Sequence, residues 1–206
     1  MKVATILNIG VTATFLIVVG TVSLIATREW GVPKPGKLME LGSVPDFRLV
    51  ESSGAERARA DLLGKVWIAS FIFTRCAEEC PAMMRAEVKL QRNLPVREDL
   101  ILVSFSVDPD YDTPERLRAY AEMFGADRSR WWFFTGDKRS IYRLAIEGFR
   151  LSTMEADPEN EMPILHSSKL VLVDRRGTIR GYYDSMDELE LRQLVRDARR
   201  LLGERT

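Results

Sequence analysis

Three side chains of this sequence can bind a soft metal or carry out redox chemistry: Cys76, Cys80 and His166. The 206 residues include no other cysteine or histidine. Two cysteines are too few for a disulfide scaffold in a chain of this length. A bridge between residues four positions apart would close a very short loop and add little stability. The pair therefore indicates chemistry rather than a structural cross-link.

The number of strong donors narrows the choice of metal. Thiolates are soft ligands that select Cu(I), zinc or iron–sulfur clusters. An iron–sulfur cluster usually requires four cysteines, and structural zinc requires four ligands. Cys76, Cys80 and His166 provide three, which favours copper. Alternatively, His166 is a hydrogen-bonded or surface residue without a metal, and the cysteines are buried apolar thiols. Met83 and Met84 follow one turn after Cys80 and are predicted core residues, not ligands.

The cysteines lie between a predicted strand and a predicted helix. Residues 65–73 (KVWIASFIF) are almost wholly apolar, as in a strand buried on both faces, and residues 83–91 have helical character. Ligands gather at the carboxyl ends of parallel strands. We expect the helix N-terminus to lower the pKa of the thiols, Pro81 to lie in the first turn, and a spacing of four to place both sulfurs on one helix face.

The remaining pattern predicts an α/β domain with a mixed sheet flanked by helices. Residues 100–107 form a second buried strand, parallel to the first because a helix connects them. Other expected strands are 44–50 and the antiparallel pair 170–173 and 179–183, and 131–134 is a short apolar run. Three helices are expected. The first starts at Pro114 after the cap Thr113 and ends near Gly125, and the other two span 138–146 and 186–202. The apolar positions of the last helix are Leu189, Leu191, Leu194, Val195, Ala198 and Leu201.

The N-terminal segment has the composition of a membrane anchor. Residues 3–27 carry no charge, and about 20 apolar residues cross a bilayer. We expect an uncleaved anchor at 1–28, a linker at 29–38 and the folded domain at 39–206, with a cleaved signal peptide as the alternative. Lys2 favours a cytoplasmic N-terminus and a domain outside. Because Lys+Arg and Asp+Glu number 30 each, the composition argues against a nucleic-acid binder.

Three segments in order resemble the Sco/SenC family of copper-binding, thioredoxin-like proteins. They are residues 71–81 (FIFTRCAEECP), 106–115 (SVDPDYDTPE), and His166-Ser167 before the strand 170–173. The resemblance covers roughly residues 44–185. It implies a thioredoxin-like fold, a copper ion held by Cys76, Cys80 and His166, and a single-pass protein of the bacterial inner membrane whose domain faces the periplasm or cell exterior. It also implies delivery of copper to the dinuclear copper centre of cytochrome c oxidase subunit II.

Three functions remain open from the sequence. In a metallochaperone, the three ligands bind copper and release it to a partner by ligand exchange. In a thiol–disulfide oxidoreductase, Cys76 and Cys80 form a redox-active pair that keeps the copper-site cysteines of the oxidase reduced, with a thiol reductant as a further partner. In a peroxidase-like redoxin, Cys76 attacks the peroxide and Cys80 resolves the intermediate.

Overall fold

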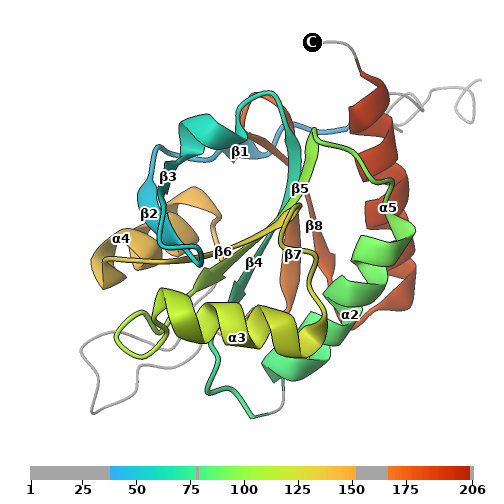
Figure 1. Cartoon of the computed structure of the whole chain (residues 1–206). Helices are drawn as coiled ribbons and strands as arrows, with labels where there is room; N and C mark the ends of the chain where they lie inside the picture. Colours follow the sequence, from blue (N-terminus) through green and yellow to red (C-terminus); the bar gives the residue numbers. More distant parts are fainter. Residues whose placement is uncertain (1–37, 78, 152–166, 205–206) are drawn as a thin grey trace, which may run out of the picture. The chain divides into compact units, whose positions relative to one another are not determined.

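The computed structural model of the chain describes residues 38–77, 79–151 and 167–204, which form one eight-stranded sheet with helices against both faces (Figure 1). The strands are β1 (Gly42–Ser43), β2 (Arg48–Glu51), β3 (Glu56–Ala58), β4 (Val66–Ile72), β5 (Leu100–Ser106), β6 (Trp131–Thr135), β7 (Lys169–Val173) and β8 (Thr178–Asp184). The helices are α2 (Glu79–Asn93), α3 (Pro114–Phe124), α4 (Lys138–Arg143) and α5 (Glu188–Gly203), with a 3₁₀ turn η1 (Arg59–Leu62) and a π-helix η2 (Leu144–Gly148).

The predicted strand–helix–strand unit forms the centre of the sheet. The strand order of the whole sheet is β1-β8-β7-β4-β5-β6-β2-β3. β4 and β5 pair in parallel from Val66 opposite Leu100 to Ile72 opposite Ser106, and every residue of both strands is buried. β6 joins β5 in parallel, whereas β7 is antiparallel to β4 and β8 is antiparallel to β7. The predictions of a mixed sheet and of the antiparallel β7–β8 pair are confirmed.

Successive residues of β4 enter two different cores, because side chains alternate between the faces of a strand. Ile68 and Ile72 pack with residues of α2, α3 and α5. Trp67 and Phe71 pack on the other face with residues of α4 and η2. Figure 1 shows α2 and α5 on one side of the sheet and α4 on the other. Burial on both faces fixes β4, and with it the position of the turn that follows.

The ends of two predicted helices follow from their capping residues. The Thr113 side chain caps α3, Pro114 is its first residue, and Gly125 ends it in the left-handed conformation at φ 72°. All three features match the prediction. Helix α5 begins at Glu188 rather than at 186, because the Asp187 side chain accepts hydrogen bonds from the first N–H groups of the helix.

The prediction of one strand over 44–50 is wrong. Only its last residues are in a strand, β2 (Arg48–Glu51), whereas β1 ends at Ser43, before the segment, and pairs with β8 rather than with β6, the partner of β2. Pro45 separates them, and proline lacks the N–H group that a ladder requires. Val44 lies between the two strands, is buried, and donates its N–H to the Gly177 carbonyl at 2.9 Å.

Two details of the predicted helices also differ. The helix expected at 138–146 is α-helical only to Arg143 and continues as the π-helix η2. Leu189, expected on the apolar face of α5, is 72% exposed. It precedes Leu191 by two positions, and residues that far apart do not share a helix face.

The predicted anchor (1–28) and the linker up to residue 37 lie outside the described residues. Among the helices that the structure does describe, none combines the length and the apolar character needed to cross a bilayer. The boundaries 1–28, 29–38 and 39–206 stay predictions.

Candidate metal centre

The two cysteines lie on either side of the start of α2, directly after the carboxyl end of β4. Cys76 precedes the helix and donates its backbone N–H to the Phe73 carbonyl at 3.2 Å. Its sulfur accepts a hydrogen bond from the backbone N–H of Cys80, also at 3.2 Å. Cys80 lies in the first turn of the helix together with Pro81, as predicted. Cys76 is therefore not on the helix, but its sulfur is held against the helix N-terminus beside Cys80.

The two thiols differ in exposure. Both are free cysteines; Cys76 is half-buried, whereas Cys80 is only 5% exposed and belongs to the core beneath α2. Burial raises the pKa of the Cys80 thiol well above its ordinary value, and the nearby Cys76 and Glu79 raise it further. The expectation of a lowered pKa is therefore wrong for Cys80, because its thiol is buried and loses its solvation. A metal must displace a proton from Cys80 in order to bind there.

A small pocket opens at Cys80 where β4 ends, β7 begins and β8 ends. It is lined by Phe71, Phe73, Glu79, Cys80, Met83, Ser167, Ser168 and Met186. The Ser168 carbonyl accepts a hydrogen bond from the Ser185 N–H at 2.9 Å, which joins the start of β7 to the end of β8. Met83 and Met84 are 2% and 0% exposed and belong to the core, as predicted. The pocket brings residues distant in sequence around one thiol.

His166 lies outside the described residues, so its place relative to the cysteines stays a prediction. Ser167, the next residue, is described and lines the Cys80 pocket. Within residues 38–77, 79–151 and 167–204, no three or more His, Cys, Asp or Glu side chains cluster in a way that could hold a metal.

The loop that carries Cys76 is fixed by two aspartates that follow β5. The Asp112 side chain is completely buried and accepts hydrogen bonds from the N–H of Thr74 at 3.0 Å, from the Thr74 hydroxyl, and from the Ser106 hydroxyl at 2.5 Å. Arg75 forms an ion pair with Asp108 at 2.6 Å. β4 and β5 are parallel neighbours, so their following loops meet at one edge of the sheet.

Sequence reasoning did not assign this role to the aspartates. The sequence nevertheless indicates that the two loops are close. Residues 106–115 follow β5, the cysteines follow β4, and these two strands are parallel neighbours. Their specific partners could be found only from the three-dimensional structure.

The family model described as SCO1/SenC matches residues 40–203 of the chain. The protein belongs to the SCO1/SenC family. Among known relatives of this Sco protein, the SCO1 protein homolog of Bacillus subtilis is 31% identical over 158 residues, covering 76% of this chain and 81% of the relative. A putative copper-binding protein of Stutzerimonas stutzeri is 30% identical over 143 residues and covers 68% of each chain.

Solved Sco structures have the same fold. A SCO1/SenC family lipoprotein of Bacillus anthracis is 33% identical with a TM-score of 0.69, covering 80% of this chain and 98% of that one. The structure of BsSco, described as a Sco family cytochrome c oxidase assembly protein with a disulfide switch, is 28% identical with a TM-score of 0.70, covering 82% and 99%. These similarities support the α/β fold with a mixed sheet flanked by helices that the sequence predicts.

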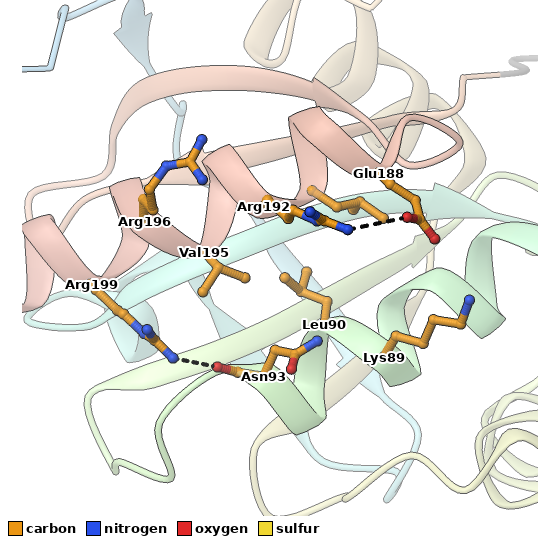
Figure 2. Close-up of a pocket in the computed structure, with 9 residues that line it drawn as sticks. Lys89, Leu90, Asn93, Glu188, Arg192, Val195, Arg196 and Arg199 are labelled. Carbon is orange, nitrogen blue, oxygen red and sulfur yellow. Dashed lines mark hydrogen bonds and ion pairs between the residues drawn. The ribbon is translucent and has the colours of Figure 1, made fainter.

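A second and larger hollow of this Sco protein lies away from the thiols. Its volume is about 470 Å³. Figure 2 shows the side chains that line this groove, which come from α2 and α5. It is lined by Lys89, Leu90, Asn93, Glu188, Leu191, Arg192, Val195, Arg196 and Arg199. Arg192 pairs with Glu188 at 3.6 Å, and Arg199 donates to the Asn93 carbonyl at 2.9 Å. The groove has a cationic rim but no thiol in its lining, so the candidate metal chemistry belongs to the smaller pocket.

Proposed function

We propose that this Sco protein is a copper metallochaperone that binds copper through Cys76, Cys80 and His166 and delivers it to the dinuclear copper centre of cytochrome c oxidase subunit II. The observation that carries the proposal is the position of the Cys76 sulfur, which accepts a hydrogen bond from the backbone N–H of Cys80, the thiol that lines the pocket. Two thiols in one turn are the soft donors that Cu(I) prefers.

The relatives support copper as the metal and oxidase assembly as the process. One relative is named as copper-binding, and another is described as an oxidase assembly protein. The third ligand is supported by chain connectivity, because consecutive Cα atoms are about 3.8 Å apart. His166 adjoins Ser167, which lines the same pocket as Cys80. An imidazole on that segment would complete a three-donor site from which copper can leave by ligand exchange.

The position of Leu38, the first described residue, is consistent with a domain that is anchored to a membrane while its cysteines stay accessible to a partner. Arg180 donates to the Leu38 carbonyl at 2.7 Å and forms an ion pair at 2.9 Å with Asp174, the residue that follows β7. β7 is antiparallel to β4, and Val173 at its end pairs with Trp67 near the start of β4. The described chain therefore begins at one end of the sheet and the cysteines lie at the other. We propose a single-pass anchor at 1–28 in the bacterial inner membrane, with the domain facing the periplasm or cell exterior.

The test is copper stoichiometry of the reduced full chain in detergent. The parent chain is expected to bind one copper ion per chain. Cys76→Ser and Cys80→Ser are expected to lose tight binding, because a hydroxyl is a hard ligand that keeps its proton. The double variant Cys76→Ser/Cys80→Ser sets the background. Stoichiometric copper on Cys80→Ser would show that the site is assigned to the wrong residues.

A thiol–disulfide oxidoreductase is the second candidate, and the unequal exposure of the two thiols favours it. The half-buried Cys76 can reach a partner disulfide, and the buried Cys80 lies next to it to resolve the mixed disulfide. In this function the pair would keep the copper-site cysteines of the oxidase reduced and would itself need a thiol reductant. The His166 variant considered in the Discussion separates the two functions.

A further inference from the structure

Two thioethers line the Cys80 pocket, and they differ in exposure. Met83 comes from α2 and is 2% exposed, whereas Met186 comes from the turn between β8 and α5 and is 49% exposed. Met83 is packed in the core, and moving it would leave a cavity. Met186 has one side toward solvent and the other toward the pocket of Cys80. Of the three sulfur side chains on the pocket lining, Cys80, Met83 and Met186, only Met186 lies outside the core, so it can move without disturbing the core.

The backbone of Met186 is held in place on both sides. Its N–H donates to the Asp184 side chain at 2.9 Å. The next residue, Asp187, caps α5 by accepting a hydrogen bond from the Leu189 N–H at 2.7 Å. The preceding residue, Ser185, is tied to Ser168 across the pocket edge at 2.9 Å. A fixed backbone therefore carries a long, flexible side chain at the rim of a pocket whose wall includes a thiol.

The chemistry of a thioether suits a rim donor for Cu(I). Sulfur in methionine is soft, so it binds Cu(I) in preference to harder ions. It is uncharged and carries no proton, so its binding needs no deprotonation, in contrast to the Cys80 thiol. The Cu–thioether bond is also weaker than a Cu–thiolate bond, so an incoming donor displaces it first.

We propose that Met186 is an additional, displaceable thioether donor for Cu(I) at the Cys80 pocket. The inference rests on the proposed copper function and specifies both the oxidation state that the site favours and the ligand that leaves when copper is passed on. During transfer, the bond from copper to Met186 breaks as a bond to the partner's donor forms, while the thiolates still hold the ion.

The test compares Met186→Leu with the parent, using the full chain in detergent under anaerobic, reducing conditions. Leucine has a similar volume and keeps the apolar contact, so the substitution removes only the sulfur. Met123→Leu is the matched control, because Met123 is 69% exposed on α3 and does not line the pocket. Cu(I) affinity is measured by competition with bicinchoninate, and the sulfur neighbours of the bound ion are counted by X-ray absorption.

The parent and Met123→Leu are expected to show three sulfur neighbours, and Met186→Leu two. The Cu(I) dissociation constant of Met186→Leu should rise about tenfold, the lower end of what losing a supporting group costs a metal site. Equal sulfur counts and equal affinities in Met186→Leu and the parent overturn the inference. That result leaves the proposed function intact, because the proposed function is tested separately by copper binding to Cys80→Ser.

Discussion

The Asp112 carboxylate accepts a hydrogen bond from the backbone N–H of Thr74 at 3.0 Å, although 38 residues separate them. Asp112 follows β5 and Thr74 follows β4, so the contact joins the loops after two parallel strands. Cys76 lies two residues beyond Thr74. The carboxylate thus sets where the thiol-bearing loop leaves the sheet.

Replacing this carboxylate should loosen the loop. In Asp112→Asn, one of the two oxygens becomes an NH₂ group that cannot accept from Thr74 or Ser106, which leaves buried donors unpaired. We expect the free energy of unfolding to fall by about 1–3 kcal/mol. Copper affinity should fall with it, because the thiols lose their fixed geometry. Urea unfolding and copper titration measure the two effects.

The control for this prediction is Asp110→Asn in the same segment. Asp110 has 75% of its side chain exposed and pairs with Lys138 at 3.3 Å. Its replacement should change stability by less than about 0.5 kcal/mol. Equal effects of the two substitutions would contradict a positioning role for Asp112.

Glu87 should make the protein less stable as the pH rises. Its side chain is fully buried on α2; one oxygen accepts from the Ser70 hydroxyl at 3.1 Å, and the other has no hydrogen-bond partner among the described residues. Burial raises the pKa of Glu87 from 4.5 to about 8. In that range the folded state holds a proton that the unfolded state releases, so stability is fully present below pH 4.5 and is lost as the pH rises toward about 8.

The variant Glu87→Gln should remove this dependence. Glutamine has the same shape and no charge, so at pH 8 the variant should be more stable than the parent by on the order of a few kcal/mol. At pH 5 the difference should be much smaller. Urea unfolding at both pH values measures it, with the exposed Glu122→Gln as control. A parent whose stability does not fall between pH 5 and pH 8 would refute the argument.

The sequence predicts the parts of this fold that depend on local pattern. The buried strands β4 and β5 are continuous apolar runs, and α3 carries its own cap in Thr113 and its own end in Gly125. The place of the two cysteines after β4 follows from these neighbours, although Cys80 lies in the first turn of α2 and only Cys76 precedes the helix. Each signal is complete within a few residues, so no tertiary information is needed.

Features that depend on distant partners were not predicted. The pKa of Cys80 depends on which residue of the first helical turn enters the core. The hydrogen bonds of Asp112 depend on Thr74, which lies 38 residues away in the chain. The pKa of Cys80 and the contacts of Asp112 depend on packing, which a local pattern does not contain. Leu189 is different, because its spacing of two from Leu191 already places it on another face of α5, where it is exposed.

Oxidation should switch copper binding off. Cys76 and Cys80 are free thiols, with the Cys76 sulfur 3.2 Å from the Cys80 nitrogen, so mild oxidation should form an intramolecular disulfide. A disulfide has no thiolate for the metal, and copper uptake should return only after reduction. Mass spectrometry detects the loss of two hydrogens, and a copper titration is run on the same sample. Unchanged uptake by the oxidised chain would mean that the thiolates are not the ligands.

Replacement of His166 separates the metallochaperone from the oxidoreductase. His166 is the only histidine of the chain, so His166→Ala removes every imidazole at once. We expect copper affinity to fall by at least about tenfold and assembly of the oxidase copper centre to stop. Formation of the Cys76–Cys80 disulfide should continue, since thiol exchange depends on the pKa and access of the sulfurs.

The comparison needs three measurements on the same variant: a copper titration, the rate of disulfide formation, and complementation of oxidase assembly in cells. Ser168→Ala is the control, because Ser168 lines the same pocket and supplies no soft donor. Loss of assembly with unchanged copper affinity would assign His166 to partner contact or redox tuning. Full copper affinity and full assembly together would leave the thiol pair as the only requirement, and the oxidoreductase function would then replace the metallochaperone, because its chemistry is the one that proceeds without an imidazole.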